Sequence, residues 1–298
     1  MPRALPVGLH MRIAITGAKG LIGTAAATYF HARGHVITRI SRQQGRLNLD
    51  PASFEDQDVV IHLAGANIAG QRWSKRYKKL LYSSRIEMTT QLCKVLANMN
   101  NPPQLFLSAS AIGIYGHIEP PSYVDESIVM GDGFLYRLCS EWEHSTNLAE
   151  KVGIRVVHMR FGIVLSQKGG ALGKMLPVFR FGFGGKLGSG KQMMSWIALD
   201  EVPAAMEHVI NTPSLAGAVN FVAPKAVSNA EFTRVLGKVL RRPAFLPVPA
   251  LAIKILFGEM GKELLLSGAN VIPKRLLESG YVFRYPDLET ALSKMLSR

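Results

Sequence analysis

The sequence predicts an α/β protein in which a Rossmann-like, doubly wound parallel sheet is followed by a smaller C-terminal α+β substrate domain. Apolar runs typical of buried strands alternate with helical patterns from residue 11 to about residue 160, and this order builds a parallel sheet with helices on both faces. From Phe161 onward the chain becomes rich in glycine and lysine. We therefore expect an N-terminal extension over 1–10, a nucleotide-binding domain over 11–165, and over 166–298 mainly a substrate or lid region, from which some segments return to the first domain.

The first strand ends in three glycines at GxxGxxG spacing, and an alanine-rich helical pattern follows. In such a strand–turn–helix, the first glycine permits a tight turn, the second lets the backbone approach a pyrophosphate, and the third lets the helix pack closely on the strand. The free N–H groups at the helix start favour the anion. We expect the turn to bind a dinucleotide through Gly17, Lys19, Gly20, Leu21 and Ile22, with Gly23 at the packing position.

The end of the second predicted strand, His35–Ile40, indicates which dinucleotide is bound. A site for NAD carries Asp or Glu here to hold the ribose 2′-hydroxyl, whereas this chain has Ser41 and Arg42. Because a guanidinium is always charged and matches phosphate oxygens, these residues favour the 2′-phosphate of NADP. The alternative is that Arg42 belongs to a solvated loop with Arg39 and Arg46.

A third apolar run ends in Leu63, Ala64 and Gly65, which we expect to border the adenosine and its ribose at the carboxyl edge of the sheet. The following helical pattern, over about 77–98, carries Arg85 on its apolar stripe. A charged side chain on a packed face is costly unless an anion meets it. Arg85 therefore either approaches the cofactor or forms a structural ion pair.

The remaining elements continue the alternation. We expect a strand over Gln104–Ser110, a helix over Phe134–Lys151 and a strand over Ile154–Arg160, with Arg160 ending that strand beside the nicotinamide. Further along, Ser228 is predicted to cap a helix, because a glutamate follows three residues later in the pattern of a capping box.

Lys and Arg outnumber Asp and Glu by 35 to 21, which gives a formal net charge of +14. This charge favours anionic partners, but the basic residues are dispersed and no RNA-binding or zinc-finger motif is present. We therefore expect a small-molecule substrate and neither nucleic acid nor a metal ion. The oligomeric state is open, a homodimer included.

The composition also predicts the compartment. The longest apolar stretch, Leu246–Gly258, is interrupted by prolines and a lysine and is too short to cross a membrane. Cys93 and Cys139 fit free thiols in a reducing compartment. The first ten residues lack a secretory signal. We expect a cytoplasmic protein without membrane partners, which starts naturally at Met1 or Met11.

Several motifs together resemble the short-chain dehydrogenase/reductase superfamily, and most closely its extended, NAD-dependent epimerase/dehydratase branch. They are the glycine turn, His62–Gly65, Ser108–Gly116 and Trp196–Val202. A narrower similarity, to the YfcH-like "epimerase family" group, is carried by Asn67–Ala69, Arg72–Trp73, Ser84–Arg85, Gly184–Gly190 and Val271–Arg275. The resemblance covers Met11 to about Leu296 and implies a Rossmann-like domain that binds NADP(H), with a small C-terminal domain that shapes a substrate pocket.

The resemblance does not extend to the Tyr-x-x-x-Lys of the superfamily, in which the lysine charge lowers the pKa of the tyrosine so that the phenol can act as acid or base. Counting forward from Tyr136 gives Ser140, and counting back from Trp142 gives Leu135 and Cys139. Neither register supplies a lysine. Tyr136 lies off the apolar stripe of its helix, so we expect it at the surface or at a rim.

Ser110 matches the carbonyl-polarising serine of the superfamily approximately, because its segment carries one extra residue. It is our candidate catalytic residue, with a loop cap as the alternative. The sequence thus favours an NADP(H)-dependent oxidoreductase of atypical short-chain type that acts on an unidentified small substrate. An anionic substrate is compatible with this interpretation. A non-catalytic NADP(H) sensor or scaffold is the alternative. A nucleotide-sugar epimerase is less favoured, because it would need the missing tyrosine as its base.

Overall fold

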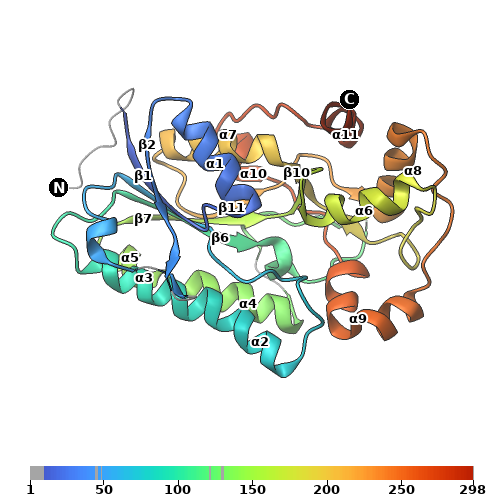
Figure 1. Cartoon of the computed structure of the whole chain (residues 1–298), viewed down its shortest axis with the longest axis horizontal. Helices are drawn as coiled ribbons and strands as arrows, with labels where there is room; N and C mark the ends of the chain where they lie inside the picture. Colours follow the sequence, from blue (N-terminus) through green and yellow to red (C-terminus); the bar gives the residue numbers. More distant parts are fainter. Residues whose placement is uncertain (1–9, 44–45, 48, 121, 129–130, 298) are drawn as a thin grey trace.

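Six parallel strands form the central sheet in the order β11-β7-β6-β5-β1-β2 (Figure 1). The computed structural model describes residues 10–43, 46–47, 49–120, 122–128 and 131–297. The strands are β1 (Arg12–Thr16), β2 (Val36–Ile40), β5 (Val59–His62), β6 (Leu105–Ala111), β7 (Arg155–Phe161) and β11 (Gly217–Phe221). From β1 the chain continues to β2 on one side and later to β5 on the other, so the strand order reverses between β1 and β5. The predicted doubly wound sheet is confirmed.

Helices cover both faces of the sheet, as a parallel sheet requires. One layer contains α1 (Leu21–His31), α7 (Val202–Asn211) and α10 (Lys274–Glu278), and the other contains α2 (Lys75–Tyr82), α3 (Met88–Ala97), α4 (Gly133–His144) and α5 (Asn147–Lys151) (Figure 1). Phe30 of α1 and Met206 of α7 are buried in one core with the strands, and Leu92 and Leu96 of α3 are buried in another. The apolar strands are therefore enclosed from both sides.

The helix expected over 77–98 is interrupted by a π-helical turn, η2 (Ser83–Glu87), which contains Arg85. Ser74 starts the preceding α2 by accepting a hydrogen bond from the N–H of Tyr77 at 3.1 Å. Turns of this kind are rare and are frequently found at functional sites. The helix expected over 134–151 is likewise divided, into α4 and α5.

A second lobe has its own core and is mainly helical. It contains α6 (Gly170–Arg180), α8 (Asn229–Leu240), α9 (Ala250–Leu265) and α11 (Leu288–Leu296), with the paired strands β8 (Ile163–Leu165) and β10 (Trp196–Ala198), and β9 (Met193–Met194) and β12 (Val227–Ser228). Ser228 caps α8 as predicted, accepting from the N–H of Glu231 at 3.1 Å. None of the helices in the described ranges is both long and apolar enough to cross a membrane. The short elements β3 (Arg42–Gln43), β4 (Arg46–Leu47), η1 (Pro51–Ser53), η3 (Ile112–Tyr115) and η4 (Leu199–Glu201) complete the described chain.

The loops after β1 and β5 approach each other so closely that a side chain would not fit between them. Gly17 has a φ of +70°, and a Cβ built on it would lie 2.7 Å from the carbonyl carbon of Leu63. A Cβ on Gly23 would lie 2.3 Å from the carbonyl oxygen of Gly17. The first and third glycines therefore fill the turn and packing positions that the sequence predicts.

We expect Gly17→Ala to lower the free energy of unfolding more than Gly153→Ala does. Gly153 also has a positive φ, but a Cβ there would meet nothing within 4 Å. Backbone strain alone should then cost about 1 kcal/mol at Gly153, and the contact with Leu63 should add about 1–3 kcal/mol at Gly17. Denaturant unfolding of the two variants measures the difference, and equal losses would show that the loops can move apart freely.

Candidate functional site

The turn between β1 and α1 presents backbone N–H groups at the carboxyl edge of the sheet. α1 begins after Gly20, which supplies no side-chain cap, and its first turn contains no acidic residue. The start of a helix attracts anions through its free N–H groups and the positive end of its dipole. The structure thus brings the five predicted pyrophosphate residues together around one helix start: Gly17, Lys19, Gly20, Leu21 and Ile22.

A chain of buried hydrogen bonds fixes the loop after β5. The backbone N–H groups of Leu63–Ala64 donate to Thr16 Oγ1 at 3.2 and 3.3 Å, and that hydroxyl donates to Nδ1 of His62 at 2.7 Å. Nε2 of His62 then donates to Thr89 Oγ1 at 3.1 Å, because Thr89 gives its own proton to the carbonyl of Arg85. Burial lowers the pKa of His62 to about 4. The ring is therefore neutral, and it links β1, β5 and the helix start after η2.

Arg85 is a largely buried cation without a carboxylate partner in the described part of the chain. Its guanidinium donates to the carbonyl of Ala66 at 2.9 Å, and its Cζ lies 5.1 Å from the ring centroid of Trp142. A Cβ on Gly65 would lie 3.5 Å from this Cζ. Burial lowers the pKa of Arg85, which reflects the cost of enclosing the charge. Among the described residues, Arg85 therefore does not form the structural ion pair that the sequence analysis gave as the alternative.

The start of α6 lies over the same edge of the sheet. A Cβ on Gly170 would lie 3.6 Å from Cδ2 of Leu21, at the start of α1. Lys174, one turn into α6, donates through Nζ to the carbonyl of Ala69 at 3.1 Å. α6 therefore spans from the glycine turn to the loop after β5 and covers the point where the strand order reverses.

The other predicted cofactor residues differ in how far they are exposed to solvent. Ser41 is exposed directly after β2, and the backbone of Arg42 forms part of β3, whereas the side chain of Arg42 lies outside the described residues. Leu63 and Gly65 are partly exposed, and Ala64 is buried.

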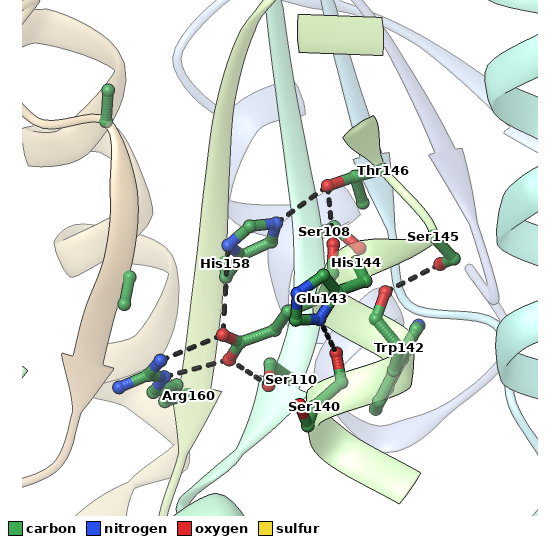
Figure 2. A network of polar contacts seen from close by, with 12 residues as sticks. Ser108, Ser110, Ser140, Trp142, Glu143, His144, Ser145, Thr146, His158 and Arg160 are labelled. Carbon is green, nitrogen blue, oxygen red and sulfur yellow. Dashed lines mark hydrogen bonds and ion pairs between the residues drawn. The ribbon is translucent and has the colours of Figure 1, made fainter. Parts of the chain in front are cut away.

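Glu143, on α4, is the centre of a second polar network (Figure 2). Arg160 donates to its two carboxylate oxygens through Nε and Nη2, both at 2.8 Å, and the Ser110 hydroxyl donates to Oε1 at 2.7 Å. Ser110 and Arg160 are opposite each other in the pairing of β6 with β7. Nη1 of Arg160 also donates to the Tyr115 hydroxyl at 2.8 Å, which in turn donates to Oδ1 of Asn220 at 2.8 Å.

The charges of this network stabilise each other. Burial raises the pKa of Glu143, but the bonds and charge of Arg160 outweigh burial and the net pKa is lowered. Burial also opposes the charge of Arg160, and the bonds to Glu143 reverse the effect, so that the pKa of Arg160 is raised. Burial raises the pKa of Tyr115. At neutral pH the network therefore contains an ion pair and a neutral phenol.

The structure places Ser110 and Arg160 together, and both side chains donate hydrogen bonds to Glu143. Ser110 is 2% exposed and Arg160 is 3% exposed. The single hydroxyl proton of Ser110 points to the carboxylate (Figure 2), and three nitrogens of Arg160 already have acceptors. A catalytic role for Ser110 and a cofactor contact for Arg160 remain predictions.

The structure decides which register of α4 faces the end of β6. A Cβ on Gly113 would lie 3.1 Å from Cβ of Leu135 and 3.6 Å from Sγ of Cys139. Burial raises the pKa of Cys139 to about 12, so its thiol is neutral. Tyr136 is half-buried on another face, beside Gly131. A leucine and a neutral thiol therefore face the segment that follows β6.

Sequence reasoning missed Glu143, Tyr115 and Asn220. One signal could have found Glu143. It follows Cys139 by four residues on the same helix, and residues spaced by four share a helix face. A second signal is Arg160 itself, because a buried arginine is costly unless it has hydrogen-bond acceptors, and a carboxylate is the strongest of these.

A cavity of about 500 Å³ lies elsewhere, lined by Glu55, Asp56, Lys94 and neighbouring residues. These residues precede β5 and β6 in the chain, so the cavity lies at the amino ends of the strands. Open α/β sheets bind their ligands at the carboxyl ends. We therefore place the candidate site at Gly17, Gly65 and Arg85 rather than at this cavity.

Comparisons with known proteins match this geometry. The profile of the NAD dependent epimerase/dehydratase family matches residues 13–221, and that of a domain of unknown function, DUF1731, matches residues 248–295. Epimerase family protein Mb2239 of Mycobacterium bovis is 39% identical over 297 residues, which cover 96% of this chain and 98% of that protein.

Solved structures give the same result. The crystal structure of human epimerase family protein SDR39U1 (isoform 2) with NADPH superimposes with a TM-score of 0.89 at 35% identity, covering 96% of this chain and 99% of that chain. Thermus thermophilus UDP-glucose 4-epimerase in complex with NAD has a TM-score of 0.73 at 16% identity, covering 95% and 97%. The second likeness shows the fold alone.

We expect Arg160→Met to lower the free energy of unfolding by about 3–5 kcal/mol, because it leaves the buried Glu143 carboxylate without its cation. The control is Glu143→Gln/Arg160→Met, which removes the stranded charge and should recover part of the loss.

The loss in Arg160→Met should also depend on pH. In the native protein the pKa of Glu143 lies below its ordinary value of 4.5, so the ion pair stabilises above that pH and the contribution is lost as pH falls. Without Arg160, burial raises this pKa instead, and stability then falls as pH rises. Denaturant unfolding should show a smaller deficit at pH 5 than at pH 8. An equal deficit at both values would mean that the carboxylate is hydrated in the variant.

Proposed function

The chain belongs to the NAD dependent epimerase/dehydratase family, and on that basis we propose that it is an NADP(H)-dependent oxidoreductase of atypical short-chain type. The observation that carries the proposal is Arg85, a largely buried cation that has no carboxylate partner among the described residues and lies against Gly65 at the point where the strand order reverses. An anionic group of a bound ligand would supply the missing counter-charge.

The residues present fit NADP(H). The approach of Gly17 to Leu63 leaves no room for a Cβ, and α1 begins without a side-chain cap, as a pyrophosphate site requires. Gly17 and Lys19–Ile22 would hold the pyrophosphate, Leu63–Gly65 would border the adenosine and ribose, and Arg85 would approach the cofactor. Ser41 and Arg42 would bind the 2′-phosphate. NADPH, when bound, supplies a hydride. The NADPH in the human SDR39U1 structure supports this choice.

Two further cations favour an anionic substrate. Lys174 reaches across from α6 to the loop after β5. Arg72 lies at the junction with α9, where its Nε is 3.1 Å from the position of a Cβ on Gly258. Both side chains are exposed, so they can attract a carboxylate or phosphate from solvent. α6 itself covers the edge of the sheet and would exclude water from a bound cofactor.

A second candidate is a non-catalytic NADP(H) sensor, which the α4 geometry favours. Leu135 and Cys139 offer no acid or base there, and the protons of Ser110 and Tyr115 are donated inside the Glu143 network. NADPH oxidation at 340 nm across a panel of small anionic carbonyl compounds separates the two functions. Turnover supports the oxidoreductase, whereas tight binding without turnover supports the sensor. A nucleotide-sugar epimerase would need the missing tyrosine.

Arg85→Met should weaken NADPH binding at least tenfold, because charge-assisted hydrogen bonds contribute about 1.5–3 kcal/mol. The unfolding midpoint without ligand should be unchanged or higher, because an unpaired buried charge disappears. Arg137 is exposed on α4. Arg137→Met makes the same charge change and should keep the native affinity for NADPH. Fluorescence titration and thermal unfolding measure both quantities. A lower midpoint with unchanged affinity would assign Arg85 a purely structural role.

NADPH should bind more tightly than NADH, and Arg42→Glu should reverse this preference by placing a carboxylate where the 2′-phosphate is expected. Arg39 is exposed and lies three residues before Arg42. Arg39→Glu makes the same charge change there and should keep the preference for NADPH. Titration of the native protein and both variants with each nucleotide checks this. Equal affinity of the native protein for NADPH and NADH would remove the argument for NADP.

A further inference from the structure

The second lobe contains a cationic pocket that shares no residue with the cofactor site. It has a volume of about 350 Å³ and is lined by Lys186, Arg234, Lys238 and Arg242, together with the buried Thr233 and the exposed Phe245. This volume lies within the range of small-ligand sites, and none of the described residues that line the pocket is a carboxylate.

One face of α8 and the chain that returns along it form the pocket. Ala230, Arg234, Gly237 and Lys238 recur at the spacing of a single helix face, and Thr233 lies beside that face. α8 ends at Leu240, and Arg241 follows as its C-cap with a left-handed φ of 53°. The next N–H, of Arg242, donates to the carbonyl of Gly237 at 3.0 Å. The chain is thereby reversed.

Gly237 allows this reversal to close against the helix. A Cβ on it would lie 2.9 Å from Cβ of Ala244 and 3.0 Å from the carbonyl oxygen of Arg242. The N–H of Val248 then donates to the carbonyl of Lys186 at 2.9 Å and fixes the returning segment beside a third part of the chain. The cations thus come from three backbone segments that are held together.

The charges in the pocket are largely uncompensated. Lys238 forms an exposed ion pair with Glu289 at 2.5 Å. Within the ranges that the structure describes, Lys186, Arg234 and Arg242 have no carboxylate at ion-pair distance. Like charges in one small pocket repel each other, and a multivalent anion would relieve that repulsion.

Thr233 provides an independent indication of a ligand. The residue is only 4% exposed, and its Oγ1 has no hydrogen-bond partner among the described residues. A buried hydroxyl without a partner is unfavourable, and such groups are few in folded proteins. Thr233 lines the pocket, and a ligand oxygen that reaches its hydroxyl would accept the proton.

We propose that this pocket is a second ligand site that binds a phosphorylated small molecule through its phosphate group. A phosphomonoester carries close to two negative charges and three acceptor oxygens, which suits three unpaired cations and one free hydroxyl better than a carboxylate does. Two of the cations are arginines, whose fork matches phosphate oxygens. Phe245 is 73% exposed at the pocket and offers an apolar contact to the rest of the molecule.

Phenyl phosphate, titrated by calorimetry into the NADPH-saturated protein, tests this site while the cofactor site is filled. We expect one saturable site, at least tenfold weaker binding in Arg234→Gln/Arg242→Gln, and native affinity within twofold in Lys94→Gln/Lys151→Gln. The control pair removes the same charge from exposed positions on α3 and α5. Phenol should not bind. Inorganic phosphate that binds as tightly as phenyl phosphate would support the site with free phosphate as its ligand.

Thr233→Val tests the hydroxyl with nearly unchanged side-chain volume. We expect threefold to tenfold weaker binding of phenyl phosphate and an unchanged or higher unfolding midpoint, because the unpaired polar atom disappears. The proposal is overturned by the absence of saturable binding, by equal losses in the control pair, or by unchanged affinity in either Arg234→Gln/Arg242→Gln or Thr233→Val.

Discussion

The buried ion pair between Glu143 and Arg160 is the interaction on which the carboxyl edge of the sheet depends. It joins α4 to β7, and Ser110 adds β6. Through Tyr115 and Asn220 it reaches β11, and Asn220 continues it to a backbone carbonyl just before α10. A buried ion pair stabilises a fold only when the remaining hydrogen-bonding groups of both side chains also have partners. The strand ends around the site therefore hold one relative arrangement.

This arrangement has a chemical consequence. The hydroxyl protons of Ser110 and Tyr115, at the carboxyl edge of the sheet, are donated within the network. Arg85, in contrast, donates only to backbone carbonyls and has no carboxylate partner among the described residues. One cation at this edge is thus neutralised by the protein, and the other is left for a ligand. The geometry therefore supports cofactor binding more directly than it supports proton transfer.

Local patterns predicted the parts of the fold that local physics determines. The glycine turn, five of the six parallel strands, the Ser228 cap and the cost of Arg85 on an apolar stripe are all visible within short windows of sequence, whereas β11 was not predicted. The π-helical turn around Arg85 was not predicted, because it depends on packing against distant segments. Glu143 was missed for the same reason: its partners lie 33 and 17 residues away, on two different strands. The register of α4 likewise became clear only from the contact with Gly113.

The second lobe completes the first rather than merely covering it. Asp132, at the start of α4, makes no side-chain cap, and the carboxylate of Glu263 on α9 accepts from the N–H groups of Phe134 and Leu135 at 3.1 and 2.9 Å instead. Glu143 lies near the other end of the same helix. A carboxylate from the second lobe thus fixes one end of α4, and the ion pair with Arg160 fixes the other. Because α4 makes both contacts, it connects the second lobe to the Glu143 network at the carboxyl edge of the sheet.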